Sequence, residues 1–352
     1  MNIIFVKKIE KYLINHNFTL KEVIATLNDN DIKNLFFVKK NKIIGSITDG
    51  DIRRGLIKGF GFNDNIQKFI NRNPLVVYSR TNLDKIKNFM MTNFINCIPL
   101  VNKKNMPLGM YINLIDSTEN ILNVPLFIMA GGKGTRLQEF TKKIPKPLLK
   151  INNKSIIEHI ILRAKKLGIL EFIISINYLG SFIKKTLKNG RQLDVKINYI
   201  EEKKKLGTAG SLSLLKKKMV RGEEIIVTNG DILSNINYQD LIKFHRLHNS
   251  VATMVVSTYI SNIPYGVVNS KKLEIIDLQE KPSFQHYVNA GIYVINKKYL
   301  SLMKKNEQLD MTDFFNILKK HKKKIIIYPI YDRWHDIGDK AEYLNIRNNN
   351  IF

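Results

Sequence analysis

The stretch FIMAGGKGTRLQEFTKKIPKPLLKI, residues 127–151, decides which fold this chain is expected to adopt. It starts within an apolar run of strand length, residues 125–130, and continues into a loop that contains three glycines. Glycines let the backbone approach a phosphate closely, and successive N–H groups in such a loop form an anion site. Arg136 and Lys146 add positive charges suited to phosphate. A simple turn is the alternative, but the strand, glycines, arginine and PKP in this order favour phosphate binding. No GK[ST] closes the loop, so it is not a Walker A motif.

Downstream of this stretch, apolar residues alternate between helical and strand spacing. Such alternation predicts a mostly parallel sheet with helices on both faces. Ligands of these sheets bind at the carboxyl ends of the strands, which is where Gly230 and Asp231 follow an expected strand. The expected elements are a helix over 154–167, a strand over 172–176, a helix over 181–188, a strand over 195–200, a helix over 210–218 and a strand over 224–229.

The first third of the chain contains an internal repeat. Leu83 follows Leu20 by 63 residues and Gly109 follows Gly45 by 64, each pair at matching places in a helix–strand–turn–strand pattern. A nearly constant offset predicts two copies of one supersecondary unit packed together. Residues 1–17 are expected to form a short helix or an entering segment.

Composition limits the class of protein. A length of 352 residues suggests two or three domains, and 44% hydrophobic residues suffice for ordinary cores. No apolar run reaches the length of a membrane span, and the start of the chain does not resemble a signal peptide. The single cysteine, Cys97, lies in an apolar run and is expected to be a small buried residue. We therefore expect a cytoplasmic protein without a membrane partner.

The net charge of +27 raises the possibility of a nucleic-acid partner. The lysine runs at 203–205, 216–218 and 322–324 are scattered, however, and no nucleic-acid-binding signature accompanies them. Solvated lysines that also attract anionic phosphates explain the charge better. We expect no nucleic-acid partner.

The pattern GGxGTRLxxxTxxxPKPLLxI resembles the signature of the sugar-1-phosphate nucleotidyltransferases, enzymes that make NDP-sugars. The resemblance implies a Rossmann-like α/β domain over residues 125–352 with a mixed, mostly parallel central sheet, after a linker at 119–124. It also implies that the glycine loop holds the nucleotide phosphates and that LGTAG, residues 206–210, faces the base. The nucleotide-binding residues so implied are Ala130, Gly131, Gly132, Gly134, Thr135, Arg136, Lys146, Gly207, Thr208, Ala209, Gly230 and Asp231.

The same resemblance implies a Mg²⁺ site and a sugar site. Asp231 of the GD pair and Asp336 of the WxDxG string would supply the oxygen ligands that Mg²⁺ requires, whereas Asp339 is expected to cap a helix over 340–348. The implied sugar-phosphate residues are Gly266, Glu280, Lys281 and Asn289, and the implied catalytic residues are Arg136, Lys146, Asp231 and Lys281. An exposed turn with a weak surface ion pair is the alternative for Glu280 and Lys281.

The repeat in residues 1–118 resembles a tandem CBS pair, a smaller α+β domain, and GSITDGDIRRGL at 45–56 is its strongest part. The resemblance implies that Thr48 and Asp51 contact a regulatory nucleotide. Thr48 or Asp49 can also cap a helix, and the two roles can hold together. In the second copy, Ile112 and Ile115 stand at the matching places, so at most one site of the usual kind is expected. CBS pairs commonly stack on one another, which favours a homo-oligomer.

A CBS pair ahead of such a domain resembles the guanylyltransferases of bacterial legionaminic-acid pathways, which use glucosamine-1-phosphate. Relatives that transfer thymidylyl groups carry Gln where Gly210 stands here, which also favours GTP. We therefore predict an enzyme that joins GTP to glucosamine-1-phosphate and releases pyrophosphate. The alternatives are a guanylyltransferase for mannose-1-phosphate or another hexose- or heptose-1-phosphate, and a nucleotide-sensing regulatory protein with an inactive transferase domain.

Overall fold

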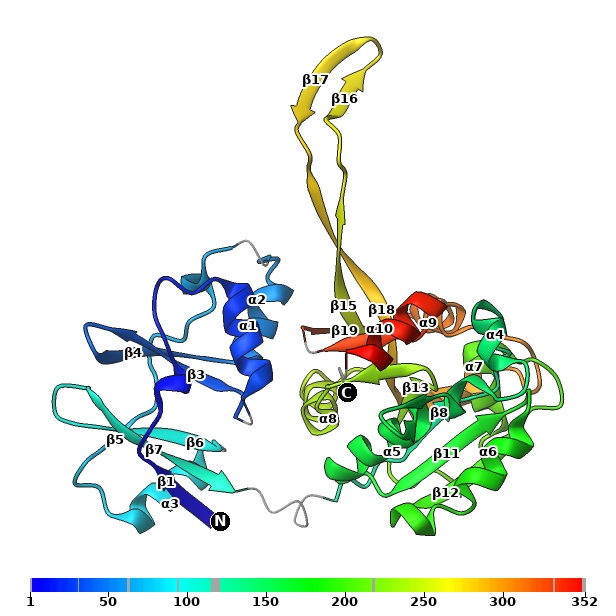
Figure 1. The fold of residues 1–352 in the computed structure, drawn as a ribbon, viewed down its shortest axis with the longest axis horizontal. Coiled ribbons are helices and arrows are strands. Elements are labelled where there is room, and N and C mark those ends of the chain that lie inside the picture. Colours follow the sequence, from blue (N-terminus) through cyan, green and yellow to red (C-terminus); the bar gives the residue numbers. More distant parts are fainter. Residues whose placement is uncertain are drawn as a thin grey trace. The chain divides into compact units, whose positions relative to one another are not determined.

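The computed structural model describes residues 2–30, 32–61, 64–93, 95–114, 121–216, 219–331 and 333–349. The chain divides into two compact units, Met1–Glu119 and Asn120–Phe352, which are coloured blue to cyan and green to red in Figure 1. Among the described residues, no helix has the length and apolar character needed to cross a membrane. Ile115 and the first two residues of the predicted linker at 119–124 lie outside the described residues.

The first unit contains two small sheets, with strand orders β1-β7-β6-β5 and β2-β3-β4. The expected helix–strand–strand pattern recurs as α1, β3 and β4 and again as α3, β6 and β7. The elements are β1 Asn2–Val6, β2 Leu13–Ile14, α1 Leu20–Asp29, β3 Asn34–Lys39, β4 Lys42–Thr48, α2 Asp49–Ile57, β5 Val77–Tyr78, α3 Leu83–Thr92, β6 Cys97–Val101 and β7 Pro107–Leu114.

The expectation of a short helix in residues 1–17 was wrong for the first residues. Residues 2–6 form β1, which pairs antiparallel with β7, so the start of the chain completes the sheet of the second repeat. Only residues 10–12 form a 3₁₀ turn. The apolar, largely β-branched residues of NIIFV favour a strand over a helix.

The second unit is organised around a seven-stranded sheet with the order β12-β11-β8-β13-β18-β15-β19. Only β18 runs antiparallel to its neighbours, so the predicted mixed, mostly parallel sheet is confirmed. The strands are β8 Leu126–Met129, β11 Glu171–Ile176, β12 Lys196–Glu201, β13 Glu224–Asn229, β15 Ala252–Asn262, β18 Ser283–Asn296 and β19 Ile325–Ile330.

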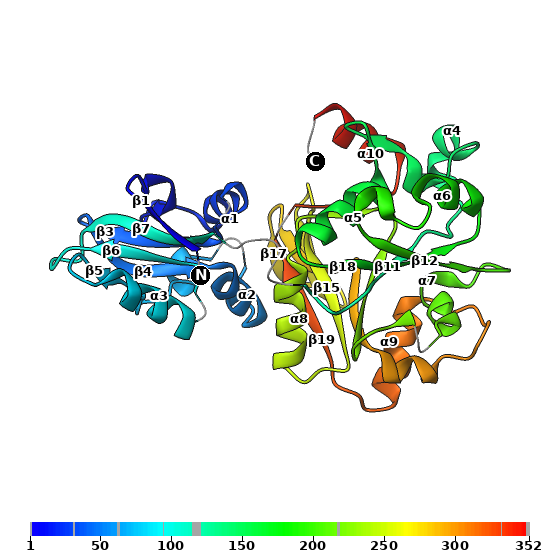
Figure 2. The ribbon, with the colours of Figure 1, turned by 90° about the horizontal axis from the view of Figure 1, so that it is seen from below.

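Helices cover both faces of this sheet. Successive residues of each strand point to opposite sides, and apolar side chains on both sides need cover. Leu126 and Ile128 of β8 pack in a core with α5 and α10, whereas Phe127 packs in a second core with α7 and α9. Figure 2 shows these helix pairs on opposite sides of the sheet. The helices of this unit are α4 Gln138–Thr141, α5 Ile156–Lys166, α6 Gly180–Leu187, α7 Gly207–Gly210, α8 Tyr238–Leu247, α9 Met311–Lys320 and α10 Lys340–Asn348.

Helix α5 begins at a reciprocal cap that the sequence KSIIE encodes. Ser155 accepts a hydrogen bond from the N–H of Glu158, and the Glu158 carboxylate accepts one from the N–H of Ser155 at 2.7 Å. We expect Ser155→Ala to lower the free energy of unfolding by about 1 kcal/mol, since it removes the acceptor of the capping box. Denaturant unfolding measures this change. Ser181→Ala, at an exposed position in the first turn of α6, is the control, and an equal loss in both variants would contradict the capping argument.

The second unit also carries a projecting element that the sequence did not predict. Strands β15 and β18 continue beyond the sheet as a two-stranded ribbon, which ends in a hairpin of β16 Val267–Lys271 and β17 Glu274–Gln279. Figure 1 shows this element in yellow, extending away from the sheet. We call residues 258–287 the arm.

Candidate functional site

A pocket of about 190 Å³ lies at the carboxyl ends of β8 and β13, the edge of the sheet where ligands were expected. The segment that ends at Pro147 and the Gly230–Asp231 pair are some 80 residues apart in the sequence. They meet here because β8 and β13 are neighbouring parallel strands. Most of the phosphate-site residues predicted from the sequence line this pocket. The lining residues are Met129, Ala130, Gly132, Gly134, Thr135, Arg136, Lys146, Pro147, Gly230, Asp231 and Gly338.

Two glycines allow the backbone to fold tightly around this pocket. Gly134 has φ +63°, and a Cβ there would lie 3.2 Å from the Cβ of Lys146. A Cβ on Gly230 would lie 2.8 Å from the carbonyl oxygen of Met129, so only glycine fits between β13 and β8 at this point. Gly132 differs, because a Cβ there would meet no atom within 4 Å. Its open surroundings leave space for a ligand beside the loop.

Lys146 and Asp231 form the central ion pair of the site. The Lys146 Nζ lies 2.5 Å from Oδ2 of Asp231, and the lysine is buried. The other carboxylate oxygen, Asp231 Oδ1, is buried without a hydrogen-bond partner in the described part of the chain. A buried anionic oxygen without a donor is costly, so this atom suits a bound cation.

Asp336 is brought beside Asp231 by a short two-stranded sheet. β14 Ile232–Ser234 and β20 Trp334–Asp336 run antiparallel, with Ile232 opposite Asp336. The N–H of Ile337 also donates to the carbonyl oxygen of Asp231 at 3.1 Å. Burial raises the pKa of the Asp336 carboxyl, and the negative charge of Asp231 raises it further. A divalent cation would relieve this repulsion.

The two carboxylates fit Mg²⁺ better than a metal that needs a full set of protein ligands. The described residues contain no group of three or more His, Cys, Asp or Glu side chains able to hold a metal ion. Mg²⁺ binds through one or two carboxylates together with waters and substrate phosphates. Asp339, in contrast, caps α10 as expected, since its Oδ1 accepts from the N–H of Glu342 at 2.9 Å.

Arg136 lies on the exposed side of the pocket. It belongs to the 3₁₀ turn Thr135–Leu137 and packs against Gly338, where a Cβ would lie only 3.2 Å from its Nη1. Arg136 is exposed, and its positive charge opposes, more weakly than burial acts, the upward shift of the Asp336 pKa. The arrangement places a cationic group at a pocket that Asp231 lines, with Asp336 close by.

The LGTAG segment, residues 206–210, holds the chain to the start of α9. Gly207 has φ +75°, and a Cβ there would lie 2.6 Å from the carbonyl oxygen of Leu309. The N–H groups of Ala209 and Gly210 both donate to that oxygen. Thr208 donates from its N–H to Asp310 at 3.0 Å and accepts from the N–H of Met311 at 2.8 Å. These residues therefore dock the loop onto the start of α9, and they do not line the pocket around Asp231.

The prediction of a helix over 210–218 was wrong about where the helix begins and ends. Its first turn is α7 Gly207–Gly210, followed by a 3₁₀ turn over Ser211–Leu214. The hydrogen bonds from Ala209 and Gly210 to the Leu309 carbonyl oxygen hold α7 in place, so that it begins at Gly207. Lys217 and Lys218 lie outside the described residues.

Glu202 is a half-buried acid beside the site, and in the sequence it stands directly before three lysines. Its carboxylate accepts from the hydroxyl of Ser175 at 2.6 Å and from the N–H of Leu206 at 3.3 Å. A Cβ on Gly131 would lie 2.9 Å from the same carboxylate. Burial raises its pKa. Glu202 therefore connects the glycine loop with the LGTAG segment. The one feature of the sequence that could have indicated this role is the position of Glu202 directly after a strand.

The predicted sugar-phosphate residues are not brought to the pocket. Gly266, Glu280 and Lys281 lie on the arm, where a Cβ on Gly266 would be 3.1 Å from the Glu280 carboxylate and Lys281 has φ +45°. Asn289 lies where β18 enters the sheet; its Nδ2 donates to the hydroxyl of Tyr293 at 2.7 Å and its Oδ1 accepts from the N–H of Gly291. The role of all four residues in sugar binding stays a prediction.

In the first unit, Thr48 and Asp51 form a capping box at the start of α2. The hydroxyl of Thr48 donates to Asp51 Oδ2 at 2.6 Å, and Asp51 also pairs with Arg54. This is the capping role considered from the sequence, and nucleotide binding by these two residues stays a prediction. A separate pocket of about 460 Å³ lies near the other end of β3 and β4, beside Phe37, Lys39 and other residues, and includes neither Thr48 nor Asp51.

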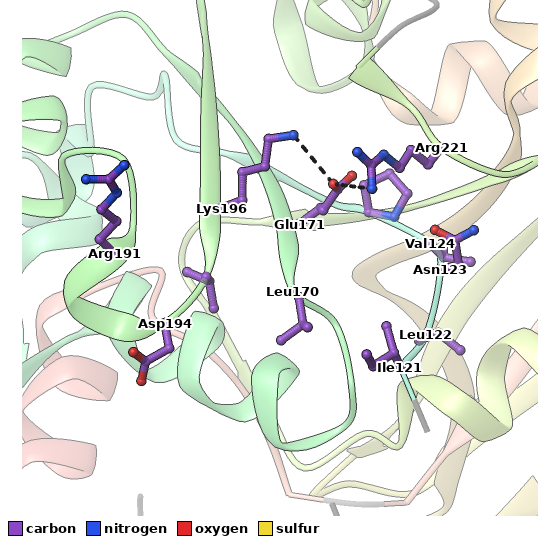
Figure 3. A pocket seen from close by; sticks show the side chains of 12 residues that line it. Ile121, Leu122, Asn123, Val124, Leu170, Glu171, Arg191, Asp194, Lys196 and Arg221 are labelled. Atoms are coloured by element: carbon purple, nitrogen blue, oxygen red, sulfur yellow. Dashed lines mark ion pairs between the residues drawn. The ribbon is translucent and has the colours of Figure 1, made fainter. Parts of the chain in front are cut away.

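Another pocket of the second unit, of about 560 Å³, lies at the amino ends of β8, β11 and β12, opposite the candidate site. Figure 3 shows Lys196 and Arg221 directed toward Glu171, with Nζ and Nη1 at 3.6 Å and 3.3 Å from its Oε1. Its second acid, Asp194, pairs with Lys165 at 2.9 Å. The phosphate-site residues predicted from the sequence line the smaller pocket around Asp231 and not this one.

Comparison with known proteins agrees with this division of the chain. A family model for nucleotidyl transferases matches residues 126–351, and a CBS domain model matches residues 8–58. Mannose-1-phosphate guanylyltransferase 1 of Arabidopsis thaliana is 31% identical over 225 residues, which are 62% of this chain and 62% of that protein. The catalytic subunit beta of mannose-1-phosphate guanylyltransferase from Dictyostelium discoideum is 30% identical over 223 residues, again 62% of each chain.

The chain thus spans about 62% of the length of these relatives. A solved structure, HddC from Yersinia pseudotuberculosis complexed with GMP-PN, superposes with a TM-score of 0.52 at 21% identity, over 64% of this chain and 99% of that chain. At this level of identity the superposition shows a shared fold.

Proposed function

The chain belongs to the nucleotidyl transferase family, and from that premise we propose that it joins an NTP to a sugar-1-phosphate to give an NDP-sugar and pyrophosphate. One observation carries the proposal: a glycine loop, Arg136, the buried Lys146–Asp231 pair and Asp336 converge at one end of the sheet. These are the groups needed to hold and neutralise phosphates.

In the proposed reaction, an oxygen of the sugar-1-phosphate attacks the α-phosphorus of the NTP. The bond between the α- and β-phosphates breaks, and pyrophosphate leaves with the electron pair. The loop amides and Arg136 bind the triphosphate. Lys146, held by Asp231, neutralises charge at the reacting phosphate. No covalent intermediate with the protein is required, so catalysis rests on alignment and electrostatics.

Asp231 and Asp336 are the residues that would hold Mg²⁺. A bound Mg²⁺ supplies charge neutralisation for the two anionic substrates. The unpartnered Oδ1 of Asp231 and the raised pKa of Asp336 support this assignment. The intact acid pair also favours an enzyme over a regulatory protein with an inactive transferase domain.

We propose GTP as the nucleotide, which is supported by the guanylyltransferase names of the relatives and by the GTAG segment at 207–210. For the sugar we retain glucosamine-1-phosphate, because a CBS domain precedes the transferase domain here. Mannose-1-phosphate is the second candidate, because the similar plant and Dictyostelium proteins are named for it. Membership of the legionaminic-acid pathway, a cytoplasmic location, and a regulatory nucleotide at Thr48 and Asp51 stay predictions.

Pyrophosphate release from each of the four common NTPs, with Mg²⁺ and a panel of sugar-1-phosphates, tests this function. We expect release only when a sugar-1-phosphate is present, with GTP and glucosamine-1-phosphate as the best pair. Release with GTP and mannose-1-phosphate instead would keep the reaction and replace the sugar. Absence of release with every pair would contradict the proposed function.

Two neighbouring glycines of the loop provide a matched test of phosphate binding. We expect Gly132→Ala to leave stability unchanged, because its Cβ meets no atom, but to raise the KM for the NTP by about tenfold if the added methyl occupies ligand space. Gly134→Ala should lower the free energy of unfolding by about 1–2 kcal/mol as well, since residue 134 has φ +63°. Thermal unfolding and steady-state kinetics measure both effects. An unchanged KM in Gly132→Ala would argue against a triphosphate at this loop.

A further inference from the structure

A pocket of the first unit combines an apolar lining with a basic one. Its volume of about 460 Å³ lies within the roughly 300–1,000 Å³ of ordinary ligand sites. It lies near the turn that joins β3 to β4, whereas Thr48 ends β4 and Asp51 follows in α2. The pocket is therefore separate from the place where the sequence predicted a regulatory nucleotide. The lining residues are His16, Phe37, Lys39, Ile44, Gln67, Ile70 and Arg72.

A β-bulge in β4 supplies part of the apolar lining. Phe37 pairs with Gly45 and Val38 pairs with Ile43, so Ile44 has no opposite residue in β3. Such a bulge re-aims the side chain of the extra residue and is common beside functional sites. Ile44 is 40% exposed and lines the pocket, while Phe37 is buried. The bulge therefore turns an apolar side chain toward a possible ligand instead of the core.

The segment 70–72 forms a second wall that is fixed to β4. The N–H of Ser46 donates to the carbonyl oxygen of Asn71, and the N–H of Asn71 donates to that of Ser46, both at 2.9 Å. Gly45 permits this close approach, because a Cβ there would lie 2.5 Å from Cγ2 of Ile70. Arg72 follows directly in the chain, so its backbone is anchored beside the pocket that its side chain lines.

The positive charge of this pocket is not neutralised by acids of the described chain. Of its lining residues, Lys39 and Arg72 are basic and none is acidic. Neither of the two forms an ion pair with another residue that the structure describes. In the same unit, by contrast, Arg53, Arg54 and Lys68 each pair with an aspartate. A pocket that holds two unpaired cations attracts an anion.

The lining suits a ligand with two chemically different parts. Lysine and arginine bind phosphate oxygens, and His16 and Gln67 can donate hydrogen bonds to the same group. Phe37, Ile44 and Ile70 offer apolar surface to the remainder of the ligand. Nucleic acid is bound along a longer groove of positive charge, which one pocket with two cations does not provide. We propose that this pocket binds a small phosphorylated molecule with an apolar or aromatic body. The proposal concerns the first unit and does not depend on the proposed function.

Methyl nuclear magnetic resonance of the full chain, titrated with phenyl phosphate, inorganic phosphate or phenol, tests the class of ligand. The δ1-methyl signals of Ile44 and Ile70 report on the pocket, and that of Ile232, next to Asp231, reports on the candidate site of the second unit. Substitution of each isoleucine by valine assigns its signal. We expect phenyl phosphate to shift the Ile44 and Ile70 signals and to bind about tenfold more tightly than either fragment, because it uses the cations and the apolar surface together.

Two results of this titration would overturn the proposal. Equal affinity for inorganic phosphate and phenyl phosphate would mean that the apolar lining does not take part, and equal affinity for phenol would mean that the cations do not. Shifts confined to Ile232 would place phosphate binding in the second unit alone.

Three substitutions locate the binding site without any measurement of turnover. We expect Lys39→Met and Arg72→Gln each to weaken phenyl phosphate binding by about tenfold, since each removes a charge-assisted contact. Lys103→Met is the matched control, because Lys103 lies in the corresponding turn of the second repeat and does not line the pocket. Its affinity should stay within about twofold of wild type at 0.15 M salt. An equal loss in all three variants would assign the binding to the net charge of +27 and contradict a built site. All three residues are exposed, and thermal unfolding checks that each variant keeps its fold.

Discussion

Asp231→Asn is expected to lower kcat by on the order of 10³-fold, which corresponds to about 4 kcal/mol of transition-state stabilisation. The substitution removes the negative charge that holds the Lys146 Nζ, which lies 2.5 Å from Asp231 Oδ2. It also replaces the buried Oδ1, the atom best placed to hold Mg²⁺. Steady-state kinetics with saturating Mg²⁺ and substrates measure the effect. The free energy of unfolding should fall by no more than about 2 kcal/mol, since Asp336 remains near Lys146.

Asp339→Asn is the matched control for this substitution. It makes the same change of charge three residues after Asp336, but Asp339 caps α10, and asparagine caps helices about as well as aspartate. Its kcat should stay within about twofold of wild type. A full rate in Asp231→Asn, or an equal loss in both variants, would mean that Asp231 does not act as proposed.

Lys146→Met should give the second-largest loss, with kcat/KM reduced by about 10²- to 10³-fold. Methionine can fill the buried space of the lysine stem but leaves the Asp231 carboxylate without its cationic partner. The two acids of the site would then repel the incoming phosphates. We expect the KM for the NTP to rise together with the fall in kcat, because the lost charge acts on the nucleotide before and during the reaction.

Lys143→Met tests whether this loss comes from the pocket or from net charge. Lys143 lies in the same segment but is exposed, so its removal lowers the charge of the chain equally without touching the Asp231 pair. Its kcat/KM should remain within about twofold of wild type at 0.15 M salt, where exposed charges are screened. Comparable losses in both lysine variants would favour long-range attraction over a specific contact.

The sequence allowed the phosphate side of the site to be predicted because that side depends on local signals. The glycines and Arg136 follow a strand directly, and Gly230 and Asp231 do the same, so the topology of a parallel sheet brings them together. The Lys146–Asp231 pair, 85 residues apart, follows from the same topology once both strands are placed. The cap on α10 was also predictable, because Asp339 stands directly before a helical pattern.

Features that depend on long-range packing could not be predicted. The bonds that hold LGTAG to Leu309 join residues about 100 positions apart and leave no periodic signal. The arm has the alternation of ordinary strands, so its exposure is visible only once the rest of the sheet is in place. Glu202 was obscured by the lysines around it, because composition indicates a solvated surface there while the carboxylate is in fact held by Ser175.

The most direct test of the central claim is ³¹P nuclear magnetic resonance of the full chain with GTP, Mg²⁺ and either glucosamine-1-phosphate or mannose-1-phosphate. The proposed function predicts that the GTP signals are replaced by the paired resonances of a diphosphate-linked sugar together with one equivalent of pyrophosphate. Asp231→Asn should show neither product. Release of inorganic phosphate without a sugar-linked diphosphate, or unchanged spectra with both sugars and other NTPs, would contradict the assignment of this site to nucleotidyl transfer.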